Sequence, residues 1–193
     1  MEELFQQIVE LLFRILLNPS IFGGDRADQI WKTYMHYRTQ SRRFDIEQDF
    51  LVGNIMLALG EFGRAIDAMQ YGLQHASAKQ LSVRHYIYLT EAYLAFLRYR
   101  HEKANRHIPF SEIKKFVEKV KKSCKKHPRV IASAYEAASR RSCSGDLTRD
   151  ERKEMVEYYF KKARHYYEKA GECPQEFKEW QEFIEKKRFC SEE

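Results

Sequence analysis

The residues whose types could do chemistry are cysteines, histidines and carboxylates, and their spacing decides which reactions are open to them. Cys124 and His127 form one pair at a separation typical of metal ligands. No second pair follows at a zinc-site spacing, and the other three cysteines, Cys143, Cys173 and Cys190, are widely separated. We therefore expect no metal site and no cofactor.

The arrangement of the polar residues also argues against catalysis. None of the 7 histidines or the many carboxylates lies in a nucleophile elbow, a phosphate-binding loop or a metalloprotease motif. The sequence predicts a protein that is not an enzyme.

A cluster of lysines is the most unusual charged feature. The segment from Ser111 to Arg129 contains eight basic and two acidic residues, which accounts for the whole formal net charge of +6. Two readings stay open, a solvated helix face or a surface that attracts an acidic protein, RNA or a membrane surface. Lysine suits charge attraction better than bidentate recognition, and no known nucleic-acid motif accompanies the cluster. Its candidate residues are Lys114, Lys115, Lys121, Lys122, Lys125 and Lys126.

The elements that must position these residues are predicted to be helices. The chain has 193 residues, 44% hydrophobic and 14% aromatic, with only 8 glycines and 4 prolines. This composition supports a substantial core, and alternating apolar–polar strands are hard to find. We expect an all-α protein.

The stretch 44–76 is predicted to fold as a helical hairpin. Apolar residues recur at helical spacing before and after Gly60, which we expect to provide the turn. Glycine inside a helix costs about 1 kcal/mol relative to alanine. Gly53 and Gly72 should therefore mark the close approach of the two helices.

This stretch resembles the tetratricopeptide repeat (TPR) family. Gly53 and Met56 match the small and large positions of its first helix, and five further residues match its turn and second helix: Gly60, Phe62, Ala65, Gly72 and Leu73. Two looser units follow. Ala92-Tyr93 and Ala134-Tyr135 match the alanine–tyrosine positions of the family.

Helix boundaries in these later units are also predicted from the sequence. Ser111 and Glu112 should begin a helix after a connection that contains Pro109, and its apolar stripe is Ile113, Phe116, Val117, Val120 and Cys124. Thr148 with Glu151 predicts a capping box. Gly171 and Pro174 follow the last helix of the third unit.

The whole chain is therefore predicted to be one all-helical domain, residues 1–193. The resemblance implies a right-handed solenoid of antiparallel helix hairpins over 44–174. Residues 1–43 should form N-terminal packing helices, including one over 26–40 that Asp25 could cap and that turns Ile30, Trp31, Tyr34 and Tyr37 inward. Residues 175–193 should supply a capping helix with the stripe Phe177, Trp180, Phe183 and Ile184.

The resemblance implies a non-catalytic adaptor or scaffold that binds a peptide or protein partner in a groove lined by the first helices of the repeats. Matching positions propose the groove residues Phe50, Asn54, Arg84, Ile87, Glu91, Arg129 and Ser133. Asn54 matches an asparagine with which chaperone-binding members hold a terminal carboxylate. Phe50 stands where those members carry a lysine.

Two alternatives stay open. One is an RNA-binding helical repeat, as the interferon-induced TPR proteins imply, which would use the lysine-rich helix with Tyr86, Tyr88, Tyr135 and Phe116. The other is a structural subunit of a larger assembly.

The N-terminus begins with acidic residues and its apolar run is interrupted by Arg14, so we expect no secretory signal and no membrane span. We expect free thiols in a reducing cytoplasmic or nuclear compartment.

Overall fold

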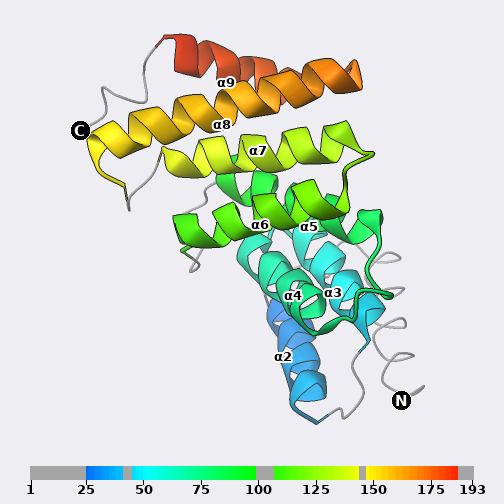
Figure 1. Ribbon diagram of the computed structural model, residues 1–193. Helices are drawn as coiled ribbons and strands as arrows, with labels where there is room; N and C mark the ends of the chain where they lie inside the picture. The colour runs from blue at the N-terminus through cyan, green and yellow to red at the C-terminus, as the bar shows by residue number, and fades with distance from the viewer. Residues whose placement is uncertain (1–24, 41–44, 99–106, 144–146, 187–193) are drawn as a thin grey trace.

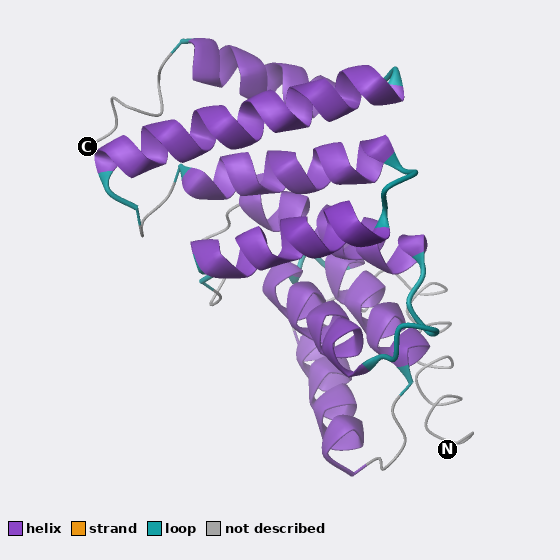
Figure 2. Ribbon diagram, in the orientation of Figure 1, coloured by secondary structure: helices purple, strands orange, loops and turns teal. Residues whose placement is uncertain are grey.

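The computed structural model describes residues 25–40, 45–98, 107–143 and 147–186, and every regular element in these ranges is a helix (Figure 2). This confirms the all-α prediction. The helices are α2 Asp25–Gln40, α3 Ile46–Ala58, α4 Phe62–His75, α5 Val83–Arg98, α6 Phe110–Ser123, α7 Pro128–Ser142, α8 Arg149–Ala170 and α9 Gln175–Glu185. The apolar run predicted before residue 18 lies outside the described residues.

The α3–α4 hairpin forms where it was predicted. Gly60 takes a φ of 77°, a left-handed conformation that larger residues resist. A Cβ atom on Gly53 would lie 2.5 Å from Met69 Cγ, and one on Gly72 would lie 3.0 Å from Asp49 Cβ. Both glycines are therefore required by the close approach of α3 and α4, as the sequence indicated.

The predicted boundaries of α8 are confirmed, and the start of α6 differs from its predicted position by one residue. Thr148 and Glu151 form the capping box of α8, and Gly171 ends that helix with a φ of 68°. Helix α6 begins at Phe110, one residue before the predicted start, because Pro109 occupies the N-cap. The Glu112 carboxylate in its first turn accepts hydrogen bonds from the Tyr93 hydroxyl and the Gln70 amide, both at 2.8 Å.

Helix α7 occupies the centre of the C-terminal half. It packs along α8 and also contacts α5 and α6, and Figure 1 shows α6, α7, α8 and α9 as successive layers above α2, α3 and α4. The α5–α6 pair is joined through long side chains, since the rings of Tyr93 and Phe116 lie 4.9 Å apart. Helix α7 consequently has buried residues on nearly all sides.

The last described helix covers α7 and α8 with aromatic residues. Phe177 stacks on Phe160 of α8 at 5.4 Å, and the Trp180 indole donates to Ser139 of α7 at 3.1 Å. Of the predicted stripe, Phe177, Trp180 and Ile184 are buried and Phe183 is partly buried. Buried apolar residues from α2 to α9 form one contiguous core.

Ala65→Trp is expected to lower the free energy of unfolding by about 1–3 kcal/mol or more, because an indole has no room in a packed core. Ala65 is fully buried, and its carbonyl oxygen lies 3.2 Å from the position of a Cβ on Gly53. Urea unfolding followed by circular dichroism measures the effect. The matched control is Ala58→Trp, which places the same side chain at an exposed position of α3. Equal stability of the two variants would contradict the close hairpin packing.

Candidate functional site

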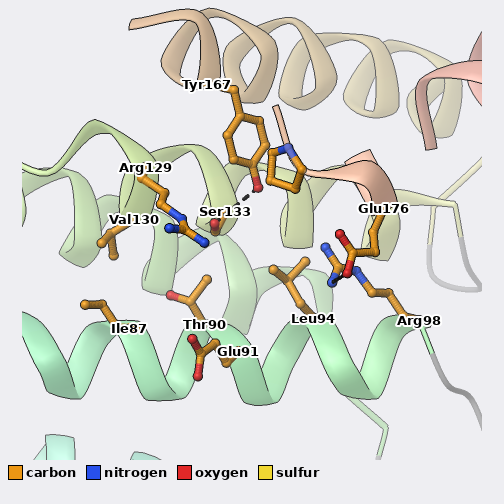
Figure 3. A pocket seen from close by; sticks show the side chains of 11 residues that line it. Ile87, Thr90, Glu91, Leu94, Arg98, Arg129, Val130, Ser133, Tyr167 and Glu176 are labelled. Carbon is orange, nitrogen blue, oxygen red and sulfur yellow. Dashed lines mark hydrogen bonds and ion pairs between the residues drawn. The ribbon is translucent and has the colours of Figure 1, made fainter. Parts of the chain in front are cut away.

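A cavity of about 340 Å³ lies between α5 and α7, next to the end of α8 and the start of α9 (Figure 3). Its walls combine aliphatic side chains, hydroxyl groups and both signs of charge. The lining residues are Ile87, Thr90, Glu91, Leu94, Arg98, Arg129, Val130, Ser133, Tyr167, Pro174 and Glu176.

A buried carboxylate supports one wall of this cavity. Glu136 has no solvent-exposed side-chain surface, and it accepts hydrogen bonds at 2.8 Å from Arg98, Arg140 and the Tyr167 hydroxyl. A buried charge is stable only when it is paired and hydrogen-bonded, and here two guanidinium groups supply that compensation. Glu136 therefore fixes the orientation of two residues that line the cavity, Arg98 and Tyr167.

The same network sets the protonation of its members. Burial alone would lower the pKa of Arg98, but the charge and hydrogen bond of Glu136, with Glu176 nearby, raise it overall. Burial raises the pKa of Tyr167, and the Glu136 carboxylate raises it further. The Tyr167 hydroxyl is also 3.1 Å from the Ser133 hydroxyl. Both Arg98 and Tyr167 thus keep their protons at neutral pH and donate hydrogen bonds to Glu136.

Two charged residues from different helices lie at the more exposed part of the cavity. Arg129 of α7 is 3.1 Å from Glu172, with which it forms an ion pair. Burial raises the pKa of Glu91 on α5, and the charge of Arg129 partly offsets that rise. The two residues are therefore close enough to influence each other electrostatically.

The structure brings together four of the seven residues proposed for the groove. Ile87, Glu91, Arg129 and Ser133 all line the cavity. Arg84 does not, because it points to an ion pair with Glu47. Asn54 is half-buried on α3 and is not among the lining residues either.

Phe50 is a correction to the predicted groove. Its side chain is only 2% exposed, and its ring packs 4.6 Å from the ring of His85 and against the surface left open by Gly72. Phe50 is a core residue because the missing side chain at Gly72 lets α4 approach it closely. It is therefore not accessible to a partner in a groove.

Some residues that line the cavity were not predicted from the sequence, although the sequence contained a signal for Leu94 and Arg98. Leu94 and Arg98 continue the helical spacing of Ile87 and Glu91 on one face of α5. Tyr167 and Glu176 come from segments far along the chain, and nothing in their local sequence indicates that they meet α5.

The lysine cluster is fully on the surface. Lys114, Lys115, Lys121, Lys122, Lys125 and Lys126 are exposed on α6 and the turn after it, and Lys121 lies 3.7 Å from Glu118. Three of the aromatic residues considered for base stacking, Tyr86, Tyr135 and Phe116, are buried, and Tyr88 is partly buried. These three buried rings belong to the core, so the prediction that they stack on RNA bases is wrong.

The cysteines show no arrangement for metal binding in the described part of the chain. Cys124 is buried, and burial raises the pKa of its thiol to about 11. Cys143 is partly buried and Cys173 is exposed, each as a free thiol. No cluster of three or more potential metal ligands is found among the described residues. Cys190 lies outside them.

No helix in the described ranges has the length and apolar character needed to cross a bilayer. Comparison of this chain with family models, curated proteins and solved structures finds no match.

Proposed function

We propose that this chain is a non-catalytic, TPR-like adaptor that binds a peptide segment of a partner protein in the cavity between α5 and α7. The observation that carries the proposal is the lining itself. Positions taken from the TPR resemblance, Ile87, Glu91, Arg129 and Ser133, surround a cavity whose walls include fixed polar groups. In this proposal α3, α5 and α7 are the first helices of successive repeats and α9 is the cap.

The size and walls of the cavity suit side chains of a peptide. A volume of about 340 Å³ is at the small end of the range for ligand pockets, roughly 300–1,000 Å³. This space accommodates one or two side chains, while the rest of an extended segment would lie along the surface. Apolar contact would come from Ile87, Leu94, Val130 and Pro174, and hydrogen bonding from Ser133 and Tyr167.

The proposal predicts that Arg129→Glu changes peptide affinity by about tenfold or more, in the direction set by the charge of the bound segment, while Arg84→Glu has little effect. Each arginine is more than half exposed and forms an ion pair with one glutamate, Glu172 or Glu47, but only Arg129 lines the cavity. Reversing the charge of a residue in the cavity wall exchanges attraction for repulsion toward a charged ligand, and a change of about 1.4 kcal/mol in binding free energy is tenfold in affinity. The measurement is fluorescence anisotropy with peptides selected from a phage-displayed random library by the full chain.

The two variants also control for folding, since both replace an exposed, ion-paired arginine. Circular dichroism should give the same helicity for both proteins. An equal change of affinity in both variants, or none in either, would exclude the cavity as the peptide site. A library that yields no specific binder would contradict the adaptor function.

A second candidate function is binding of single-stranded RNA by the lysine surface of α6. The observation that favours it is an exposed aromatic ring on α8 with a lysine of the same helix beside it. Tyr158 of α8 is 47% exposed, with the Lys162 ammonium 5.8 Å from its ring centroid. The start of α6 reaches this part of α8, because the rings of Phe110 and Tyr159 lie 5.8 Å apart. Exposed rings and lysines together are typical of sites that bind single strands.

The RNA candidate predicts saturable binding of a uridine 20-mer, with log affinity falling against log salt by about 0.7 per phosphate contact. Changing Lys121, Lys122, Lys125 and Lys126 to glutamate should abolish this binding and flatten the salt dependence. Tyr158→Ala should weaken it by about fivefold or more through lost stacking. Lys178→Glu with Lys186→Glu, two exposed positions at α9 and its C-cap, serves as the control. Absence of saturable binding at low salt would exclude this function.

A further inference from the structure

We infer that the cavity between α5 and α7 selects its partner by a cationic side chain, lysine or arginine, that pairs with Glu91. An apolar residue next to this cation would fill the space beside Ile87, Leu94 and Val130. This inference rests on the proposed peptide-binding function and names the chemistry of the segment that is bound.

The guanidinium groups around the cavity are already committed to carboxylates of the protein. Arg98 and Arg140 both donate to Glu136 at 2.8 Å. Arg98 is also 3.9 Å from Glu176, and Arg129 is 3.1 Å from Glu172. The positive charges on this side of the molecule are therefore balanced before any ligand arrives.

Glu91 is the carboxylate in the cavity wall for which no hydrogen bond or ion pair within 4.0 Å is found among the described residues. Figure 3 shows it on α5 between Ile87 and Leu94, with Arg129 on the facing helix. Glu91 is an exposed residue at the edge of the cavity, where partial burial of its carboxyl group raises its pKa despite the charge of Arg129. A cation placed beside Glu91 would stabilise the ionised carboxylate.

An anionic ligand fits the same cavity poorly. A carboxylate bound by Arg129 would share that guanidinium with Glu172, and the incoming charge would face Glu91. Arg98 is held by Glu136, whose own burial makes separation of that pair costly. The charge pattern therefore favours a basic segment over an acidic one or a chain-terminal carboxylate.

The test uses the full chain and four peptide libraries of equal length with randomised flanking positions. The central residue is fixed as lysine, arginine, norleucine or glutamate. Norleucine keeps the aliphatic length of lysine without its charge. A charge-assisted pair predicts that the lysine and arginine libraries bind about tenfold more tightly than the norleucine library, with the glutamate library weakest.

Glu91→Gln should bring the four libraries to within about twofold of one another, because the amide has nearly the shape of the carboxylate but no charge. Glu168→Gln is the matched control. Glu168 is an exposed glutamate of α8 that pairs with Arg164 at 2.9 Å, and it does not line the cavity. This control should keep the preference for cations.

The outcomes separate the inference from the function on which it rests. Binding of all four libraries with equal affinity, or tightest binding of the glutamate library, would overturn the inference while the peptide-binding function stands. Retention of the cation preference in Glu91→Gln would also overturn it. Binding of none of the libraries would overturn the proposed function and the inference together.

Discussion

Replacing Glu136 by alanine is expected to lower the free energy of unfolding by about 3–5 kcal/mol, the usual cost of removing one partner from a buried ion pair. Glu136 is completely buried and compensates Arg98 and Arg140, whose side chains are only 19% and 13% exposed. Without it, these two charges would face each other in a poorly solvated site. The Tyr167 hydroxyl would also lose its acceptor.

Glu168→Ala is the control for this prediction, since it makes the same change in an exposed ion pair on α8. Surface pairs contribute about 0–1 kcal/mol, so this variant should stay close to the unchanged protein. Urea unfolding at neutral pH, followed by circular dichroism, compares the two. Similar stabilities for both variants would show that Glu136 is dispensable for the α5–α7–α8 packing.

The second large effect is a pH dependence of stability that originates at Asp49. Burial raises the pKa of this carboxyl from 3.8 to about 6, although the hydrogen bond from Tyr34 and the charge of Arg38 act in the opposite direction. Asp49 is 4% exposed, and its Oδ1 accepts from the Tyr34 hydroxyl at 2.6 Å. Helix α2 is thereby held to α3 by a carboxyl group that loses its proton at a higher pH in the folded than in the unfolded state.

The direction of the effect follows from the two pKa values. A carboxyl whose pKa is higher in the folded than in the unfolded state adds stability below about pH 4, and this contribution disappears as the pH rises through about 6. At about 1.36 kcal/mol per pKa unit, the change attributable to Asp49 is about 3 kcal/mol. The free energy of unfolding should therefore decrease between about pH 4 and pH 7 by about this amount more in the unchanged protein than in Asp49→Asn.

Chemical denaturation at several pH values across this interval measures the difference. The amide introduced by Asp49→Asn cannot titrate, and its oxygen can still accept a hydrogen bond from the Tyr34 hydroxyl. Asp150→Asn makes the same substitution at an exposed position of α8 and should leave the pH dependence as it is in the unchanged protein. Parallel pH profiles for the unchanged protein and Asp49→Asn would mean that Asp49 is ionised in the folded state.

Much of the local structure was predictable because it depends on short-range rules. Gly60 provides the left-handed turn between α3 and α4, and the stripe from Ile113 to Cys124 is the buried face of α6. Helical periodicity and capping depend on residues a few positions apart, so their physics is visible in the sequence. The same applies to Thr148 and Glu151 at the start of α8.

The candidate site was only partly predictable. Four residues of the proposed groove line the cavity because α5 and α7 turn corresponding faces toward each other. Phe50 and Arg84 were predicted for the same groove, yet one is buried beside Gly72 and the other pairs with Glu47. The neighbouring helix decides between these environments, and local spacing does not encode which helix that is.

The sequence by itself determined that this protein is helical, where the turn between α3 and α4 and the two ends of α8 lie, and which faces of α6 and α9 are apolar. Only the tertiary structure decided that Arg98, Glu136 and Tyr167 form one buried network beside a cavity, and that Glu91 has no ion-pair partner there among the described residues. The physical reason is the range of the interactions. Helix formation and capping act within a few residues, whereas charge pairing and burial depend on which distant segments the packing of α5, α7 and α8 brings into contact.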